Sequence, residues 1–244
     1  MIPLNLADLA LRAATGHWLL AFDFDGTLVP IADHPDAVTF SLQVYRDLEE
    51  LARWAPVAII SGRSRADLAA RCPPGPLLLG NHGSEGLPDL AWIESRAREA
   101  AGLWLPRLRR RFTGGGCWVE DKGLSLSLHW RAARDPARAE VVARRLTADL
   151  WPEPRLVDGH LVLNLLHPDL PDKHAALLHL LQHHPAAMFV GDDWNDASAL
   201  ASTDPRIHGV QVGDLPLGAP WRLENQAEVG RFLNLLLHEV QHHA

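Results

Sequence analysis

The 244-residue chain is poor in cysteine and has no long apolar run. Two cysteines, Cys72 and Cys117, are too few for a disulfide-stapled fold or a four-cysteine zinc site. No segment approaches the roughly 18 consecutive apolar residues of a membrane-spanning helix. The first 18 residues carry acidic and polar side chains where a signal peptide needs a charged segment and an apolar core. We therefore expect a cytoplasmic protein without a membrane partner.

Basic residues are also fewer than acidic ones: the chain has 23 Lys and Arg and 30 Asp and Glu, which gives a net charge of -7. This balance argues against nucleic acid as the main partner, because phosphate backbones need stripes of Lys and Arg. Residues 86–165 depart from it, with 13 basic and 10 acidic residues. A basic insert in an acidic body suits a metal site that faces a phosphate-binding insert. With 47% hydrophobic and 22% charged residues, the chain is neither disordered, collagen-like nor a coiled coil.

Short apolar runs outside this insert predict buried parallel strands. They lie at residues 18–23, 57–60, 77–80, 186–190 and 207–212, and polar, glycine-containing turns follow them. Helical spacing is found at residues 41–54, 64–70, 172–183 and 224–237. In an open parallel sheet these turns share one edge, which is where α/β proteins bind ligands.

The middle of the chain has a different pattern. An Arg-rich helix is expected at residues 90–112 and another helix at 135–149. Residues 117–121 and 124–130 predict an antiparallel hairpin across Lys122-Gly123, whose second strand alternates leucine with polar residues and should have one solvated face. Residues 155–166 predict another hairpin, across Asp158-Gly159. The expected fold is therefore α/β, with a Rossmann-like body at 1–85 and 166–244 and a smaller α+β domain at 86–165.

The segment DFDGT follows the first predicted strand and carries Asp23 and Asp25. A tight turn at a strand end lets both carboxylates reach one site, where one can attack and the other can exchange protons. Gly26 permits a positive φ and a close approach of the backbone to a phosphate. The alternative is an Asx-type turn that only begins a loop.

The segment GDDWND, residues 191–196, follows the strand predicted at 186–190. Four of its side chains bear oxygen atoms that suit Mg²⁺, namely Asp192, Asp193, Asn195 and Asp196. Carboxylates crowded in this way repel one another unless a cation is present. Asp193 or Asn195 can also cap a helix, and both interpretations can hold together.

Two weaker signals complete the set. Ser61 and Gly62 end the second strand, where a hydroxyl and backbone N–H groups at a helix start form an anion site. Lys173 opens a helix at the end of the insert and can clamp a phosphate, although an isolated lysine is more often a solvated surface residue.

The order of these turns along the chain resembles that of haloacid-dehalogenase (HAD) phosphatases, and the insert occupies the position of their C2-type cap. Five segments, at residues 22–38, 61–68, 80–86, 119–131 and 191–200, resemble trehalose-6-phosphate phosphatases. The resemblance implies a Mg²⁺-dependent phosphatase in which Asp23 is the nucleophile and Asp25 the general acid and base. It implies Mg²⁺ at Asp23, the Asp25 carbonyl and Asp192, supported by Asp193 and Asp196. Phosphate would bind Gly26, Thr27, Ser61, Gly62 and Lys173.

The same resemblance implies a small-molecule partner, a sugar phosphate. Its binding residues would be Arg63, Asn81, His82, Glu120, Lys122, His129, Arg131 and Asn164. For Glu120 and Lys122 the alternative is a surface ion pair across the hairpin. A monomer is the working expectation, although the sequence does not determine the oligomeric state.

Four positions depart from the family pattern. Asn164 stands where the family has a cap glutamate, His174 replaces a glycine, and Asn195 and Ala197 replace a threonine and a glutamate of the metal motif. Asn195 is chemically neutral, whereas Asn164 replaces a charged sugar acceptor with an amide. Another sugar phosphate, of glucosylglycerol, mannosylglycerate or sucrose, therefore stays open as the substrate. A catalytically silent sugar-phosphate-binding domain is the alternative from another class.

Overall fold

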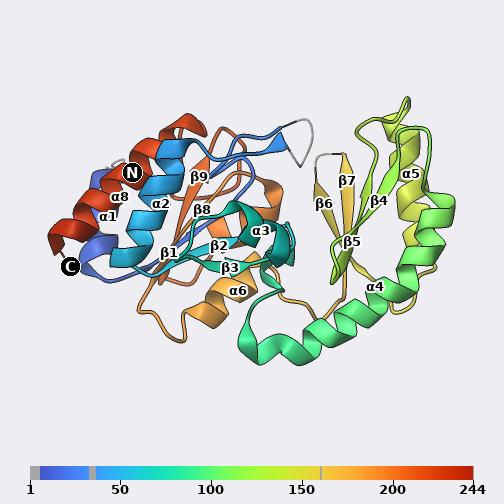
Figure 1. Ribbon diagram of the computed structural model, residues 1–244, viewed down its shortest axis with the longest axis horizontal. Helices are drawn as coiled ribbons and strands as arrows, with labels where there is room; N and C mark the ends of the chain where they lie inside the picture. The colour runs from blue at the N-terminus through green and yellow to red at the C-terminus, as the bar shows by residue number, and fades with distance from the viewer. Residues whose placement is uncertain (1–5, 33–36, 160, 244) are drawn as a thin grey trace. The chain divides into compact units, whose positions relative to one another are not determined.

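The computed structural model describes residues 6–32, 37–159 and 161–243. The chain divides into two compact units (Figure 1). The body contains Met1–Gly83 and Asp172–Ala244, and the insert contains Ser84–Pro171. Residues 33–36, within the DFDGT-containing segment of the family resemblance, lie outside the described residues.

The body is built on a six-stranded sheet in the order β10-β9-β8-β1-β2-β3, with every neighbouring pair parallel. The strands are β1 (Leu19–Phe22), β2 (Val57–Ile60), β3 (Leu77–Leu79), β8 (Ala187–Gly191), β9 (Ile207–Val212) and β10 (Trp221–Leu223). The chain moves outward from β1 through β2 to β3, then returns to β8 on the other side of β1. The carboxyl ends of β1 and β8 therefore meet at the point where the strand order reverses, the usual ligand position in such sheets.

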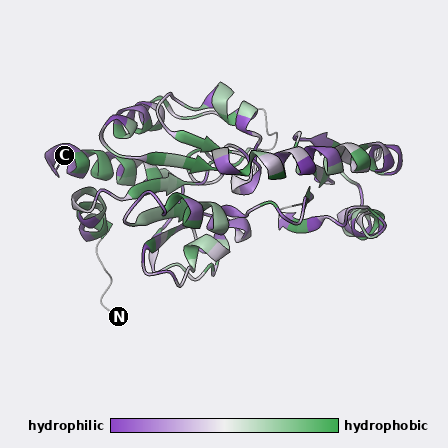
Figure 2. Ribbon diagram, turned by 90° about the horizontal axis from the view of Figure 1, so that it is seen from below, coloured by the Kyte–Doolittle hydropathy of each residue, from purple (hydrophilic) through white to green (hydrophobic). Residues whose placement is uncertain are grey.

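This parallel sheet confirms the predicted α/β class and adds one strand, β10, that the sequence analysis did not anticipate. β1, β2 and β8 are buried along their whole length because both faces of the sheet are covered. Figure 2 shows the apolar residues along the strands of this sheet.

Helices α1 (Leu6–Thr15), α2 (Leu42–Trp54) and α8 (Ala227–His243) pack together and bury their apolar faces in the core of the sheet. α2 begins as predicted at Ser41, whose side chain caps it by accepting a hydrogen bond from the N–H of Val44. α8 starts three residues later than expected and continues beyond residue 237 to His243. The shorter helices are α3 (Arg65–Arg71), α6 (Lys173–Leu180) and α7 (Ala197–Leu200), and α7 contacts β8 and β9.

The insert holds a four-stranded antiparallel sheet in the order β4-β5-β7-β6. Its strands are β4 (Trp118–Asp121), β5 (Ser125–His129), β6 (Arg155–Gly159) and β7 (Val162–Leu166). Leucines of β5 and β7 share one face and pack on α4 (Ala91–Arg111) and α5 (Pro136–Thr147), through Trp104 and Ala143 among others. No helix in the described part of the chain has the length and apolar character needed to cross a membrane.

Two expectations for the insert are wrong in detail. Asp158 and Gly159 do not form the turn, since both belong to β6 and Gly159 pairs with Val162. The observed register brings five residues of each strand into the ladder, and Leu161 takes the positive φ of the turn. Two polar residues of β5, Ser125 and Ser127, are not solvated either, and the hydroxyl of Ser127 donates to the amide oxygen of Asn164 on the neighbouring strand β7.

Candidate active site

The centre of the site lies at the adjacent carboxyl ends of β1 and β8. Asp23 directly follows β1, and its N–H donates to the carbonyl of Val190 in β8 at 2.8 Å. Asp192 directly follows β8, and one more acid, Asp196, lies within the short 3-10 turn Trp194–Asp196. Carboxylate oxygens of Asp23, Asp192 and Asp196 lie within 4.8 Å of one another. Acids from two distant parts of the chain thus share one cluster, as the two motifs predict.

Lys173, the first residue of α6, carries the positive charge of this cluster. Its Nζ donates to Oδ1 of Asp23 and to Oδ1 of Asp196, both at 2.6 Å. The lysine side chain is only 3% exposed, so the surface-lysine alternative is wrong. Burial by itself would lower the pKa of Lys173, but the attraction of Asp196 and Asp23 outweighs it and raises the pKa. The lysine therefore stays charged, which a phosphate clamp requires.

Burial has the opposite effect on the acids. It is the largest cause that raises the pKa of Asp23 well above its usual value, with Asp196 and Asp192 adding to it and Lys173 opposing it. Burial, followed by the charge of Asp196, also raises the pKa of Asp192 to about 7. More negative charge is thus gathered here than one lysine neutralises.

Asp196 organises the loop and has little capacity left for direct coordination. Its Oδ1 accepts from Lys173, and its Oδ2 accepts from the backbone N–H groups of Asp192 and Asp193, both at 3.1 Å. Asp193 in turn caps the 3-10 turn, where its carboxylate accepts from the N–H of Trp194 and from the amide of Asn195. Capping by Asp193 is therefore confirmed, whereas metal binding by this segment stays a prediction.

Gly26 and Thr27 bring the DFDGT turn against the second motif. The hydroxyl of Thr27 donates to Oδ1 of Asp192 at 2.9 Å. Gly26 has a φ of 85°, and a Cβ at this position would lie 2.0 Å from Oδ2 of Asp192. Only glycine permits both this conformation and this approach.

The donor set fits a hard divalent cation. Asp23 and Asp192 offer carboxylate oxygens, the ligands that Mg²⁺ prefers, and no nitrogen or sulfur ligand joins them in the cluster found among the described residues. The raised pKa values of both acids show that a positive charge would be stabilised between them. The carboxylate of Asp25 pairs with Arg63 instead, and metal binding by the Asp25 carbonyl stays a prediction.

The ends of β2 and β3 form a second group of predicted residues. Ser61 is buried, and its Oγ accepts from the N–H of Arg63 at 3.2 Å. Asn81 and His82 follow β3 with positive φ values of 49° and 61°, and their N–H groups donate to the carbonyls of Arg63 and Ser61. A Cβ on Gly62 would meet the imidazole of His82 at 2.7 Å. These contacts fix the loop after β2 against the loop after β3.

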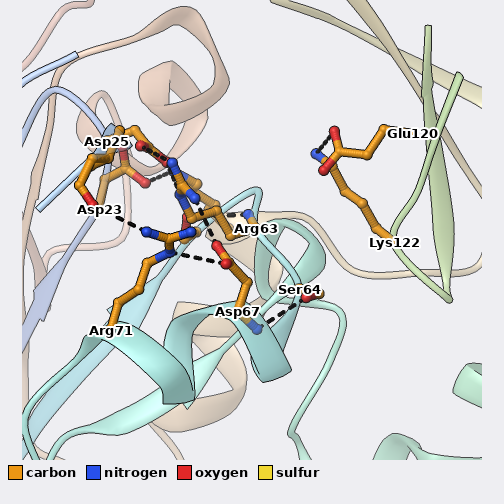
Figure 3. Close-up of polar contacts among 11 residues, drawn as sticks. Asp23, Asp25, Arg63, Ser64, Asp67, Arg71, Glu120 and Lys122 are labelled. Carbon is orange, nitrogen blue, oxygen red and sulfur yellow. Dashed lines mark hydrogen bonds and ion pairs between the residues drawn. The ribbon is translucent and has the colours of Figure 1, made fainter. Parts of the chain in front are cut away.

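Arg63 binds both carboxylate oxygens of Asp25 through its guanidinium group (Figure 3). Its Nε donates to Oδ2 at 2.7 Å and its Nη2 donates to Oδ1 at 2.8 Å, the bidentate geometry that makes arginine–carboxylate pairs strong. Burial alone would lower the pKa of Arg63, but its bonds to Asp25 and Asp67 outweigh burial and raise it. The prediction treated Arg63 as a substrate ligand and missed this pairing.

Asp67 and Arg71 extend the pairing along α3, and neither was among the residues predicted for the site. Asp67 accepts from Nη1 of Arg63 at 2.7 Å and from Nε of Arg71 at 2.9 Å. The signal in the sequence is the four-residue spacing of Asp67 and Arg71, which lie on one side of α3. Arg63 precedes the helix, and its pairing with Asp67 depends on the extended residue Ser64 between them.

The insert carries five of the eight predicted sugar-binding residues. Oε2 of Glu120 lies 2.7 Å from Nε2 of His129. The same oxygen lies 3.9 Å from Nζ of Lys122 (Figure 3). The indole of Trp118 stacks on the imidazole of His129, with ring centroids 4.6 Å apart. Arg131 lies just beyond β5 and is exposed. Glu120, Lys122 and His129 are therefore assembled as one polar group within the insert.

Asn164 is placed differently from these residues. It is buried, its amide oxygen accepts from the hydroxyl of Ser127 at 2.6 Å, and its amide nitrogen donates to the carbonyl of Val157 at 3.2 Å. The side chain thus links three neighbouring strands of the insert. Sugar binding by Asn164 stays a prediction, now set against this structural function.

An acidic cluster lies at the switch point of the parallel sheet, a buried lysine starts the returning helix, and an α+β unit is inserted in the chain. This is the arrangement that the resemblance to HAD phosphatases led us to expect. The trehalose-phosphatase family model matches residues 21–215. Trehalose-phosphate phosphatase of Mycobacterium ulcerans is 33% identical over 90% of this chain, and trehalose-6-phosphate phosphatase of Escherichia coli is 29% identical over the same share. The chain belongs to the trehalose-phosphatase family.

These relatives differ in length from the chain. The matched region covers 61% of the mycobacterial protein and 86% of the E. coli protein. Among solved structures, the C-terminal domain of Candida albicans trehalose-6-phosphate phosphatase superposes with a TM-score of 0.71 at 21% identity. The match covers 97% of this chain and 98% of that domain, which shows the shared fold.

Proposed function

We propose that the protein hydrolyses trehalose 6-phosphate to trehalose and phosphate through an aspartyl-phosphate intermediate on Asp23. The observation that carries this proposal is the placement of Asp23, which lies at a buried strand end between Lys173 and two further acids. A nucleophilic carboxylate needs a nearby positive charge if it is to meet a phosphate dianion. The family and its curated relatives support trehalose 6-phosphate as the substrate.

In the first half-reaction, a carboxylate oxygen of Asp23 attacks the phosphorus and the P–O bond to the sugar breaks. Lys173 orients Asp23 and offsets the charge on the phosphoryl oxygens, because its Nζ is buried beside the attacking group. The hydroxyl of Ser61 is a further donor for these oxygens, and the backbone at Gly26, Thr27 and Gly62 is proposed to line the same site. The negative charge that builds up during transfer is thus met by donors already in place.

Asp25 is the group proposed to move the proton. It protonates the departing sugar oxygen, and in the second half-reaction it deprotonates the water that attacks phosphorus and releases Asp23. Both of its carboxylate oxygens accept hydrogen bonds from Arg63 in the structure. Each of these oxygens keeps a second lone pair, so Asp25 can carry and transfer a proton while Arg63 holds it.

Mg²⁺ is the proposed cofactor, and Asp23, the carbonyl of Asp25 and Asp192 would hold it. When bound it neutralises charge on the phosphoryl group and on the attacking carboxylate. Thr27 positions Asp192 for this purpose through the bond to Oδ1, and Asp196 fixes the backbone of the same loop.

Sugar recognition is assigned to Glu120, Lys122 and His129, since sugar hydroxyls need both donors and acceptors. One observation favours a different sugar phosphate as a second candidate. The amide of Asn164 already forms hydrogen bonds with Ser127 and Val157. The charged carboxylate that the family pattern places at this position, as an acceptor for the sugar, is therefore missing.

The test is release of phosphate from trehalose 6-phosphate with and without Mg²⁺, beside glucose 6-phosphate, sucrose 6-phosphate and glucosylglycerol phosphate. Asp23→Asn is the blank, and borohydride reduction during turnover should convert Asp23 to homoserine if the acyl phosphate forms. Selective release from trehalose 6-phosphate is expected. Release from another sugar phosphate alone would overturn the substrate, and release by Asp23→Asn would overturn the nucleophile.

A further inference from the structure

Arg63 is held by more contacts than its bond to Asp25 requires. Its Nη1 donates to Oδ2 of Asp67 at 2.7 Å, and its guanidinium carbon lies 5.3 Å from the centre of the Phe24 ring. The arginine side chain is only 11% exposed. An arginine has several rotatable bonds, and its fork holds a carboxylate in one orientation only where those bonds are restrained.

The restraint on Arg63 comes from α3. Asp67 lies in the first turn of this helix, and its N–H is capped by Ser64 at 3.2 Å. Its second oxygen accepts from Nε of Arg71, and Nη1 of Arg71 donates to the carbonyl of Val38 at 3.1 Å. Asp67 is therefore fixed by backbone capping on one side and by an anchored arginine on the other (Figure 3).

These bonds form one continuous chain, from Asp25 through Arg63 and Asp67 to Arg71 and the loop at Val38. Each link joins opposite charges at 2.7–2.9 Å except the last, which ends on a carbonyl. Asp67 is partly exposed, so surface ion pairing alone would contribute little to stability. A function that depends on geometry rather than on stability explains better why both oxygens of Asp67 are used.

We propose that Asp67 and Arg71 are positioning residues for Asp25 and act on it through Arg63. This inference rests on the proposed function, because it takes Asp25 as the group that protonates the leaving sugar. Asp67 orients the guanidinium fork, the fork orients the carboxylate of Asp25, and Arg71 prevents Asp67 from turning away. In this proposal, neither Asp67 nor Arg71 takes part in the making or breaking of bonds.

The test compares two leaving groups. A sugar alkoxide is a poor leaving group and needs the proton of Asp25, whereas p-nitrophenolate leaves readily without one. With enzyme in excess and Mg²⁺ present, the rate of leaving-group release reports the first half-reaction alone. Asp67→Asn, which keeps the shape and removes the charge, should slow trehalose release about tenfold. Its p-nitrophenol release should stay within about twofold of the wild-type rate.

The matched control is Glu50→Gln, which removes a 2.8 Å ion pair to Arg53 on the surface of α2. It should change neither rate. Arg71→Gln should reproduce the selective loss in a smaller amount, and it serves as the second variant if Asp67→Asn does not fold. A double-mutant cycle adds a further check, because Asp67→Asn should have almost no additional effect in an Asp25→Asn background.

Equal slowing of both leaving groups in Asp67→Asn would mean a merely structural role and overturn the inference. A raised KM for trehalose 6-phosphate with an unchanged rate of release would assign Arg63 to substrate binding and also overturn it. Should the wild type prefer another sugar phosphate, that ester replaces trehalose 6-phosphate and only the substrate proposal fails. A wild type that cleaves no phosphate ester would overturn both proposals.

Discussion

Replacing Lys173 with methionine should destabilise the metal-free protein, because it leaves two buried carboxylates without their counter-charge. Nζ of Lys173 lies 2.6 Å from both Asp23 and Asp196, whose side chains are 8% and 0% exposed. Removing one partner of such a buried pair costs about 3–5 kcal/mol. Methionine fills a similar volume, so the loss reflects charge rather than a cavity.

The size of this loss has an upper bound that depends on pH. A carboxyl group that cannot stay ionised can take up a proton instead, which costs about 1.4 kcal/mol for each unit between the pH and its ordinary pKa of about 3.9. The bound per carboxylate is roughly 4 kcal/mol at pH 7 and roughly 1.5 kcal/mol at pH 5. Since the folded variant then binds more protons than the unfolded chain, the variant should regain stability as the pH falls.

Thermal unfolding in EDTA, followed by circular dichroism at pH 7 and pH 5, measures both effects. At pH 7 the Tm of Lys173→Met should lie about 10 °C below that of the wild type, since 1 kcal/mol shifts a chain of this size by about 2–4 °C. The difference should shrink to less than half at pH 5. Arg53→Met, which breaks the exposed pairs with Glu49 and Glu50, is the control and should change the Tm little at either pH.

Two results would refute this reasoning. A variant as stable as the wild type at pH 7 would mean that Lys173 does not offset the buried acids. An equal loss at pH 7 and pH 5 would mean that packing, rather than charge, accounts for the destabilisation.

Three further predictions concern the cation, the close approach at Gly26 and the insert. The pKa of Asp192 is raised to about 7 in the folded protein, so the folded state binds more protons than the unfolded chain between about pH 4 and pH 7. The metal-free protein should therefore lose stability as the pH rises through this range, and Mg²⁺ should raise the Tm more at pH 8 than at pH 5. A Tm that is independent of pH without metal would contradict this. Gly26→Ala should lower kcat at least tenfold, because the added Cβ would lie 2.0 Å from Asp192. Gly213 has a similar φ of 83° but open space around it, so Gly213→Ala is the control and should lower only the stability, by about 1 kcal/mol. Glu120→Gln should raise the KM for trehalose 6-phosphate about tenfold and leave p-nitrophenyl phosphate hydrolysis unchanged, and equal loss on both substrates would count against sugar recognition by Glu120.

The central site could be predicted from the sequence because of how parallel strands are arranged. Apolar runs that end in Asp23 and in Asp192 place both acids at the same edge of the sheet, whatever the loops between them do. Lys173 can be placed at the same edge once a helix is recognised after it, because a helix that connects two parallel strands begins at the carboxyl edge of the sheet. What the sequence does not show is its burial, since a lone lysine before a helix is usually solvated.

The parts that escaped prediction depend on pairing between elements. β10 has only three residues and carries Arg222 in its middle, so no apolar run marks it. The second hairpin of the insert contains Asp158-Gly159, a strong turn signal, yet β6 continues through both residues because the longer ladder satisfies more backbone groups. In such cases local turn preference is outweighed by the hydrogen bonds of the whole strand.

Asn164 and Asp67 differ in the same way, because the contacts of Asn164 depend on pairing between strands and those of Asp67 on local sequence spacing. In an antiparallel sheet, a polar side chain on one face either reaches solvent or bonds to the neighbouring strand, and the spacing within one strand does not decide between them. The register places Asn164 beside Ser127 and Val157, and this neighbourhood, rather than its sequence motif, makes it a link between strands. Asp67 shares one side of α3 with Arg71, and their four-residue spacing after Arg63 is visible in the sequence. Charge alternation in the helix that follows a motif arginine is therefore a signal that the amino-acid sequence alone displays, whereas the pairing of a central strand residue depends on the register of the sheet.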